Sequence, residues 1–367
     1  LEEHSDPVRS VAFLHDLTWL ASASNDGTVK VWDARSGECL STLKGHSDLV
    51  RSVAFSHDLT RLASVSGDGI VKVWDARSGE CLLTLEGYSD WVSSVVFSHN
   101  STRLASASGY GIVKVWDARS GECLSTLEGH SDWVESVAFS HDSTWLASAS
   151  WDGTVKVWDA RSGECLSTLE GHSASVNLAA FSHDLTWLAS ASRDCTVKVW
   201  DARSGECLST LEGHSASVDS VAFSHDSIWL ASASNDGIVK VWDARSGECL
   251  STLEGYSDRV NSVAFSHDSI WLASASNNGI VKVWDARSGE CMSTLEGYSA
   301  SVNSVAFLHD LTWLASASND CTVKVWDARS AECLLTLKGY SDFVGLVAFS
   351  HDSTRLVSAS CYGIVKV

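Results

Sequence analysis

Residues 129–170 read GHSDWVESVAFSHDSTWLASASWDGTVKVWDARSGECLSTLE, and close copies of this stretch fill the chain. A Trp-Asp pair marks each complete copy, and neighbouring pairs are 42 residues apart without insertion or deletion. A fixed period of about 20–50 residues is the signature of a repeat architecture, in which each unit buries its core against its neighbours. We therefore expect one array of equivalent units, whose marker tryptophans are Trp32, Trp74, Trp116, Trp158, Trp200, Trp242, Trp284 and Trp326.

Each copy contains four short runs in which apolar and polar residues alternate, as they do in β-strands. In the quoted stretch these runs cover residues 134–139, 146–150, 154–158 and 165–169, and the segments between them are rich in turn-forming Asp, Gly, Ser and His. Four antiparallel strands make a small sheet with two faces to cover. Radial stacking covers both faces, so the pattern predicts an all-β fold of the β-propeller type.

The unit resembles the WD40 repeat family, because it has Gly-His near its start, Asp in its second hairpin turn and Trp-Asp at its end. This resemblance covers all of the chain. The wording SHDST, SASxDGTVKVWD and SGECLxTLEGHS is similar to the C-terminal repeat arrays of fungal NLR-type receptors, the NACHT–WD40 proteins that include the heterokaryon-incompatibility (HET) group. The resemblance implies a non-catalytic recognition module whose signalling domains lie upstream in a longer protein.

The repeat predicts a single domain, residues 1–367. Nine copies of the first three strands are present, but the sequence contains eight complete fourth strands. We expect nine blades of four-stranded sheet, the ninth lacking its outer strand. The alternative is an eight-bladed ring with a swapped or disordered ninth unit, since about four to eight blades are typical, although it would leave strands unpaired after residue 339. The units start near residues 3, 45, 87, 129, 171, 213, 255, 297 and 339.

The formal net charge of −20 argues against nucleic acids and anionic membranes as partners, because both attract clustered basic residues. The sequence has no apolar run of the roughly 18 residues that span a bilayer, and its first ten residues do not resemble a signal peptide. Eight of the eleven cysteines share one repeat position, where we expect small buried residues of a strand. Reduced cysteines without a secretory signal favour the cytoplasm. We expect no cofactor and no metal.

Five units carry His, Ser, Asp and Trp together, which at first sight suggests a hydrolase triad. A catalytic site needs one such set in a unique cleft with an oxyanion donor, whereas these sets recur through the chain. In similar WD-repeat proteins the His bonds the Asp and the Ser, and the Ser bonds the Trp indole, so the resemblance implies a buried structural network. The expected networks are His4/Ser22/Asp26/Trp32, His46/Ser64/Asp68/Trp74, His130/Ser148/Asp152/Trp158, His172/Ser190/Asp194/Trp200 and His214/Ser232/Asp236/Trp242.

The other four units have Tyr in place of the network His. In three of them the Asp has changed too, as expected if a lone buried carboxylate is costly. In the fourth we expect the phenol to donate to the retained Asp. We expect all four units to be less stable than the five intact ones. The pairs are Tyr88 with Tyr110, Tyr256 with Asn278, Tyr340 with Tyr362, and Tyr298 with the retained Asp320.

A second His series occupies the first hairpin turn of every unit. Regular His-Asp pairs suggest metal binding, but we expect each copy to lie on a different blade, too far from the next to share an ion. Turn formation is the expected role. The series is His15, His57, His99, His141, His183, His225, His267, His309 and His351.

Most repeat positions barely change, but positions five, seven and twenty-three vary widely, counting the Gly of Gly-His as position one. Positions five and seven are two apart on the first strand, so we expect their side chains to point the same way. Position twenty-three lies in the turn at the same end of the blade. Trp, Arg, Glu, Ser and Gly exchange at these positions, a range that a packed core does not tolerate. We expect the three columns to form a partner-binding rim; drift at unconstrained surface positions is the alternative.

Aromatic side chains beside charges are typical of binding hot spots, and they gather in consecutive units at Trp91, Trp133, Glu135, Trp151 and Arg193. We expect the footprint of a protein ligand in that sector. The full set of expected partner-binding residues is Leu49, Arg51, Trp91, Ser93, Trp133, Glu135, Trp151, Asn177, Arg193, Asp219, Arg259 and Phe343.

The leading interpretation is the ligand-sensing domain of a fungal NLR-like receptor that binds a protein and performs no catalysis. Two other interpretations stay open. One is a general scaffold propeller without a receptor role, and a P-loop upstream in the parent gene would separate it from the first. The other is a propeller enzyme, for which Glu135 and Asp219 are the nearest candidate carboxylate pair.

Overall fold

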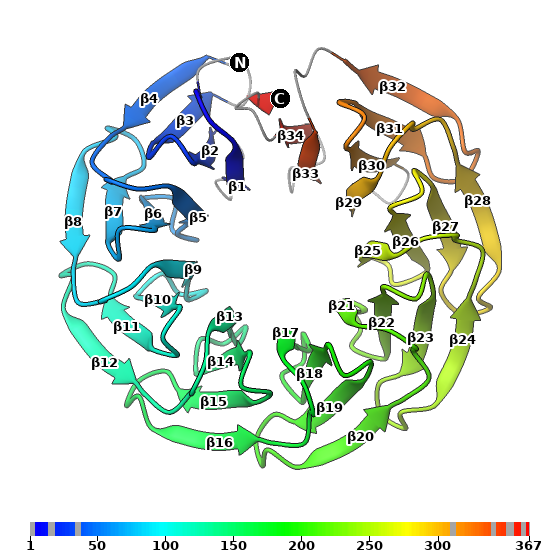
Figure 1. The fold of residues 1–367 in the computed structure, drawn as a ribbon, viewed down its shortest axis with the longest axis horizontal. Coiled ribbons are helices and arrows are strands. Elements are labelled where there is room, and N and C mark those ends of the chain that lie inside the picture. The colour runs from blue at the N-terminus through cyan, green and yellow to red at the C-terminus, as the bar shows by residue number, and fades with distance from the viewer. Residues whose placement is uncertain are drawn as a thin grey trace. The chain divides into compact units, whose positions relative to one another are not determined.

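The computed structural model describes residues 4–13, 19–33, 38–308, 313–338, 343–349, 356–360 and 365–366 (Figure 1). These residues contain strands and no helix. Eight repeats each form one four-stranded antiparallel sheet with its strands in chain order, and the ninth repeat contributes three more strands. The prediction of an all-β fold from nine repeats is confirmed. In the ninth repeat β33 and β34 pair as an ordinary hairpin.

The strands have nearly the same length in every repeat. The first strands are β1 (Val8–Phe13), β5 (Val50–Phe55), β9 (Val92–Phe97), β13 (Val134–Phe139), β17 (Val176–Phe181), β21 (Val218–Phe223), β25 (Val260–Phe265), β29 (Val302–Phe307) and β33 (Val344–Phe349). The second strands are β2 (Trp19–Ser24), β6 (Arg61–Ser66), β10 (Arg103–Ser108), β14 (Trp145–Ser150), β18 (Trp187–Ser192), β22 (Trp229–Ser234), β26 (Trp271–Ser276), β30 (Trp313–Ser318) and β34 (Leu356–Ser360).

The third and fourth strands complete each sheet. The third strands are β3 (Val29–Asp33), β7 (Val71–Asp75), β11 (Val113–Asp117), β15 (Val155–Asp159), β19 (Val197–Asp201), β23 (Val239–Asp243), β27 (Val281–Asp285), β31 (Val323–Asp327) and β35 (Val365–Lys366). The fourth strands are β4 (Cys39–Leu43), β8 (Cys81–Leu85), β12 (Cys123–Leu127), β16 (Cys165–Leu169), β20 (Cys207–Leu211), β24 (Cys249–Leu253), β28 (Cys291–Leu295) and β32 (Cys333–Leu337).

The hydrophobic core lies between neighbouring sheets. Val31 and Leu43 of the first repeat pack against Phe55, Leu62 and Trp74 of the second, and all five side chains are buried. Equivalent clusters join the second to the third repeat, the third to the fourth, and each pair from the fifth to the eighth. Each sheet thus stabilises its neighbour, as expected when a single repeat cannot bury its own faces.

The chain divides into two compact units. The first comprises Leu1–Gly171 with Cys361–Val367, and the second comprises His172–Ser360. The boundary at residues 171 and 172 falls between the fourth and fifth repeats, so it follows the sequence period. The single domain over residues 1–367 stays a prediction.

A β-bulge occurs at position seven of every repeat. In the fourth repeat Val134 pairs with Ser150 but Ser136 pairs with Ala149, so Glu135 is the extra residue, and each first strand shows the same register shift. A bulge bends its strand and turns the extra side chain out of the regular alternation. Simple strand alternation therefore does not by itself set the direction of the position-seven side chain.

The repeated cysteines lie at the edge of each sheet. Cys81, the first residue of β8, is exposed, as are its counterparts in the following repeats, and Cys39 is half-buried. The expectation of buried cysteines is wrong because the fourth strand is the edge strand, and its first two residues are not covered by a neighbouring sheet. The exposed counterparts are Cys123, Cys165, Cys207, Cys249, Cys291 and Cys333.

Candidate functional site

Positions five and twenty-three meet in every repeat whose position twenty-three is described. The backbone N–H of Trp151 donates to the carbonyl oxygen of Trp133 at 2.9 Å, and the same bond recurs from the first repeat to the eighth at 2.7–3.2 Å. This bond closes the turn between the second and third strands onto the entry of the first strand. The predicted convergence of these columns therefore exists within each repeat; position twenty-three of the ninth, Cys361, lies outside the described residues.

Position seven joins the same cluster through its side chain. In the fourth repeat the indole Nε1 of Trp151 donates to Oε2 of Glu135 at 3.0 Å. The first repeat has a bond from Arg9 Nε to Asn25 Oδ1 at 2.9 Å. Comparable side-chain pairs join positions seven and twenty-three in the fifth, seventh and eighth repeats. In these five repeats the three variable positions form one rim segment.

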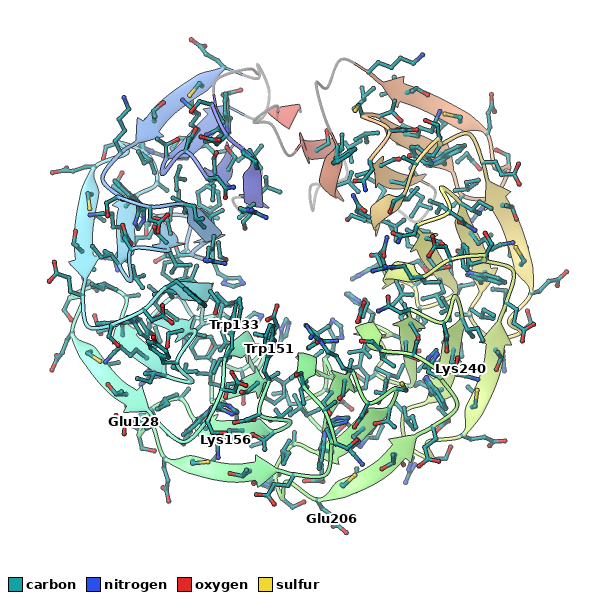
Figure 2. All side chains as sticks on the ribbon, in the orientation of Figure 1. Glu128, Trp133, Trp151, Lys156, Glu206 and Lys240 are labelled. Atoms are coloured by element: carbon teal, nitrogen blue, oxygen red, sulfur yellow. The ribbon has the colours of Figure 1, made fainter. Side chains whose placement is uncertain are left out.

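In the first unit, rim side chains of three repeats form a continuous row. The guanidinium carbon of Arg51 lies 5.4 Å from the ring centroid of Trp91. The Trp91 and Trp133 ring centroids are 5.5 Å apart, and Trp133 stacks on Trp151 at 4.7 Å with 30° between the rings. Figure 2 shows Trp133 and Trp151 next to one another, where β13 begins and β14 ends. We call Arg51, Trp91, Trp133, Trp151 and Glu135 the aromatic row.

The aromatic row is largely half-buried, and two of its indole N–H groups make no hydrogen bond. Its three tryptophans are half-buried and Glu135 is exposed. The indole Nε1 atoms of Trp91 and Trp133 are buried without a hydrogen-bond partner, an arrangement that costs about 1–3 kcal/mol per group. A Cβ on Gly109 would lie 2.5 Å from Nε1 of Trp91, so the glycine at position twenty-three of the third repeat makes room for the ring.

Two features of this rim were not predicted from positions five, seven and twenty-three. Position four is Asp wherever position five is large, and Ala wherever position five is Ser, as in Asp132-Trp133 against Ala174-Ser175. The Asp132 carboxylate accepts the N–H of Trp133 at 2.7 Å. Tyr110, which stands where the intact repeats have the network Asp, is 68% exposed and follows Gly109 in the turn. Pairwise comparison of columns four and five would have found the first signal.

The second unit carries a different row at the same positions. Asn261 Nδ2 donates to Oδ1 of Asn277 at 2.8 Å and to the Ser301 Oγ at 3.2 Å. The Ser301 hydroxyl donates to Asn277 Oδ1 at 2.6 Å, and Asn303 Nδ2 donates to Asn319 Oδ1 at 2.5 Å. We call Asn261, Asn277, Ser301, Asn303 and Asn319 the amide row. Its polar side chains pair largely with one another.

The remaining expected partner-binding residues differ in accessibility. Ser93 donates to the carbonyls of Ala107 and Val134, so its hydroxyl joins two repeats. Asn177 donates to Asp219 Oδ1 at 3.2 Å within the second unit. Leu49 is half-buried, Arg193, Asp219 and Arg259 are exposed, and Phe343 is 48% exposed.

The five His-Ser-Asp-Trp sets form the same hydrogen-bonded chain. In the fourth repeat the Trp158 indole lies 2.9 Å from Ser148 Oγ, which lies 2.8 Å from His130 Nε2, and His130 Nδ1 lies 2.8 Å from Asp152 Oδ2. The other four sets have these bonds at 2.8–3.1 Å. In these five repeats the hydrogen bonds run from the third strand through the second strand to the His, and from the His to the Asp in the turn between the second and third strands.

The serine at the centre of each set is inaccessible to solvent. Every one of the five has an exposed fraction of 0%, and its hydroxyl bonds both the indole and the imidazole of its own repeat. A nucleophile must reach its substrate, so these serines cannot act as one, and they present nothing to a binding partner. They belong to the core of the sheets and to no accessible site. The five are Ser22, Ser64, Ser148, Ser190 and Ser232.

The protonation of these sets follows from their geometry. A carboxylate only accepts, so the His Nδ1 carries the proton, and Nε2 then accepts the Ser hydroxyl. Burial lowers the pKa of His46, His172 and His214, which keeps the rings neutral. Burial alone would raise the pKa of Asp194, but hydrogen bonds from Thr196, the backbone of Ser173 and His172 lower it to about 2.

Tyrosine replaces the network His by reaching the Ser directly. The Tyr88 hydroxyl lies 2.7 Å from both the Oγ and the carbonyl oxygen of Ser106, and it accepts the N–H of Lys114 at 3.1 Å. Tyr256 and Tyr298 make the same contacts with their serines. The serine keeps its partner, so the expectation that these repeats are less stable loses its main physical reason. Tyr340 and Tyr362 lie outside the described residues.

The expected bond between Tyr298 and Asp320 is absent, and that prediction is wrong. The Tyr298 hydroxyl is taken up by Ser316. The Asp320 carboxylate instead accepts the N–H groups of Ser299 and Thr322 and the Thr322 hydroxyl. Backbone donors of the turn thus replace the imidazole as partners of the carboxylate.

The histidines of the first hairpin turn lie much closer together than expected. Ring centroids are 4.7 Å apart for His57 and His99, and 4.3 Å for His99 and His141. In the second unit the spacings along His183, His225 and His267 are 4.3 and 3.9 Å. The expectation of well-separated copies is wrong, because adjacent sheets bring equivalent turns together. His15, His309 and His351 lie outside the described residues.

In the part of the chain that the structure describes, no three His, Cys, Asp or Glu side chains are placed so that they could hold a metal ion. None of the described residues belongs to a helix with the length and apolar character that a membrane crossing requires.

The repeated sheets, their shared cores and the buried His-Ser-Trp chains define a class of repeat protein in which equivalent small sheets pack on one another. The WD domain, G-beta repeat model of the WD40 family matches residues 1–33, 37–75, 79–117, 121–159, 163–201, 205–243, 247–285, 289–327 and 331–367. The chain belongs to the WD40 family. Propellers of this family are generally non-catalytic scaffolds that bind other proteins.

Among solved structures, the chain is similar to the computationally designed Ika8 protein, with a TM-score of 0.74, 33% sequence identity, and coverage of 89% of this chain and 98% of that one. Among curated relatives, it is 53% identical over 45 residues to the WD repeat-containing protein pop1 of Schizosaccharomyces pombe. It is 49% identical over 45 residues to the nuclear distribution protein PAC1 of Arthroderma benhamiae. Each match covers 12% of this chain, and 6% of pop1 or 10% of PAC1.

Proposed function

We propose that this chain is a protein-recognition module without catalytic activity, which binds its partner through the variable rim. The aromatic row carries this proposal. It joins side chains from three repeats into one half-buried surface, at positions where the other repeats have different chemistry. Tryptophan and arginine are the side chains most enriched at binding hot spots. On the first unit the footprint is centred on Trp91, Trp133 and Trp151, and includes Leu49 at position five of the second repeat.

The rim of the second unit takes a secondary part in this proposal. Arg193, Asp219, Arg259 and Phe343 are exposed there and offer polar and apolar contacts. Asn177 and the amide row are already hydrogen-bonded and contribute shape more than binding energy.

The cellular role is the finer part of the proposal. The wording of the repeats resembles the arrays of fungal NLR-type receptors, and two of the curated relatives are fungal WD-repeat proteins. We propose a sensor domain of such a cytoplasmic receptor, with signalling domains upstream in the longer protein. A general scaffold without receptor role is the second candidate, which the family alone supports. A P-loop segment encoded upstream would favour the receptor, and its absence from the complete gene would favour the scaffold.

The binding face is tested by comparing proteins retained by immobilised variants. Wild-type chain and the Trp133→Ala variant are exposed to an extract of the source organism, and retained proteins are quantified by mass spectrometry. The control is Trp313→Ala, which removes a 43%-exposed tryptophan outside the three columns. We expect Trp133→Ala to lose proteins that wild type and the control retain. Equal retention by all three chains contradicts the proposed face, provided that circular dichroism shows each variant folded.

A further inference from the structure

We infer that the aromatic row and the carboxylates beside it select a partner segment rich in Lys and Arg. The inference rests on the proposed recognition function and adds the chemistry of the partner. Its starting point is a difference in charge between two stretches of rim with the same backbone.

Carboxylates outnumber cations on the rim of the first unit. At positions four, five, seven and twenty-three of repeats one to four, five acidic residues stand against Arg9 and Arg51. At the same positions of repeats five to eight, two acidic residues, Asp219 and Asp258, stand against Arg193 and Arg259. The acidic residues of the first unit are Asp6, Asp48, Asp90, Asp132 and Glu135.

The carboxylates have oxygen atoms available to a partner. Asp48 and Asp132 are exposed, and each uses Oδ1 to accept the N–H of the next residue at 2.7 Å. That bond fixes the side chain at the rim, while the second oxygen can accept from an ammonium or guanidinium group. Charge-assisted bonds of this kind are about twice as strong as neutral ones.

The aromatic row itself already binds a cation. The Arg51 guanidinium lies over Trp91 at 5.4 Å, so the structure shows that a ring of this row accepts such a group. Lysine and arginine also carry apolar stems, which cover aromatic surface while the charged end reaches a carboxylate. Half-buried indoles that directly follow carboxylates in the sequence, as at Asp90-Trp91 and Asp132-Trp133, match both parts of these side chains. The chain's net charge of −20 adds long-range attraction.

Binding is measured by calorimetry and tryptophan fluorescence with nona-arginine, nona-lysine and, as a control probe, nona-glutamate. We expect both cationic peptides to bind at least about tenfold more tightly than nona-glutamate at about 0.15 M salt. Replacing Asp48, Asp90 and Asp132 together by Asn should weaken nona-arginine binding about tenfold, since asparagine removes the charge and keeps an oxygen for the N–H groups that Asp48 and Asp132 bind.

The matched control is Asp258→Asn in the seventh repeat. Asp258 accepts the N–H of Arg259 at 2.7 Å, just as Asp132 accepts that of Trp133, but it lies outside the aromatic row. Its change should alter nona-arginine binding less than about twofold, whereas Asp132→Asn alone should weaken it about threefold. Equal effects of the two changes would show diffuse attraction to an acidic chain and overturn the inference.

Two further outcomes separate this inference from the proposed function. If neither cationic peptide binds more tightly than nona-glutamate, while Trp133→Ala still abolishes retention of cellular proteins, the rim recognises a partner of other chemistry and only the inference fails. If Trp133→Ala changes neither peptide binding nor retention, the proposed rim function fails with it.

Discussion

The aromatic row and the amide row occupy the same repeat positions on the same bulged strand and turn, yet they use their side chains in opposite ways. In the amide row, Asn261 and Asn303 donate within the row and to backbone carbonyls. In the aromatic row, the indole N–H groups of Trp91 and Trp133 have no such partner, and the rings remain half-exposed.

The shared backbone therefore does not distinguish the two rows, and under the proposed function the side chains decide which row binds a partner. A row whose polar groups are satisfied gains little from new contacts, because binding only exchanges one hydrogen bond for another. A row of half-buried rings gains by further burial, at about 25 cal/mol for each Å² of apolar surface. The first unit is therefore where we place the footprint.

The variant Trp133→Ala should have the largest effect on stability. It removes the central ring between Trp91 and Trp151, and we expect a loss of about 2–3 kcal/mol, below the roughly 3–5 kcal/mol for a fully buried tryptophan. The matched change in the amide row, Ser301→Ala, should cost about 1 kcal/mol. Urea unfolding at equilibrium measures both, and equal losses would contradict the special role of the stacked rings.

The variant Gly109→Ala should displace the Trp91 ring of the aromatic row. The new methyl group would lie 2.5 Å from Nε1 of Trp91, so the ring must move, at a cost of about 1–2 kcal/mol. The control is Gly67→Ala, whose methyl group meets the flexible carboxylate of Asp48 at 2.7 Å and should cost about half as much. Near-ultraviolet circular dichroism should change for Gly109→Ala and much less for Gly67→Ala.

The variant Asn303→Ala tests whether the amide row is structural. It removes the donor to Asn319 Oδ1 and to the Val344 carbonyl, and we expect a loss of about 1 kcal/mol in the free energy of unfolding. Retention of cellular proteins should stay unchanged. A loss of retained proteins with unchanged stability would reverse the assignment and place recognition on the second unit.

Acid pH should give the smallest effect and should separate the second repeat, which carries Arg51 of the aromatic row, from the seventh repeat, which carries part of the amide row. Burial lowers the pKa of His46 below its usual 6.5, so the unfolded chain binds that proton first, and stability falls as the pH falls through that value. The amide row rests on repeats with Tyr256 and Tyr298, which do not titrate there. Amide protection from hydrogen exchange, corrected for intrinsic rates, should fall more in β6 and β7 than in β26 and β27 between about pH 7.5 and 5.5.

The control for this pH effect copies the seventh repeat. His46→Tyr with Asp68→Asn gives the second repeat the Tyr256 and Asn278 pair, and the difference between β6–β7 and β26–β27 should then shrink. If the double change leaves the difference as it was, the neutral imidazole is not its source.

The period of 42 residues predicted most of the fold, because every side chain of a repeat faces the same neighbours as its copies. The expected strand at 134–139 is β13, and the expected strand at 165–169 is β16. The convergence of the variable columns also followed, since the ends of antiparallel strands meet.

Features that depend on strand register and on the distance between repeats could not be predicted from the sequence. The bulge at Glu135 places two residues of β13 opposite one residue of β14, and the alternation of apolar and polar residues does not reveal it. The exposure of Cys81 was not predicted, because knowing that the fourth strand is the outer one does not reveal which of its residues a neighbouring sheet covers. The approach of His225 to His267 depends on the spacing of adjacent sheets, which the linear order of turns leaves open.

The exposed cysteines of the edge strands are native attachment sites for labels that report local unfolding. Seven chemically similar thiols, one in each of repeats two to eight, are free and exposed at the outer strands. Maleimide labels attached to single-cysteine variants would report the opening of one repeat at a time, each through a native thiol of an outer strand. The same thiols would cross-link copies in air, so preparations need a reductant to remain monodisperse.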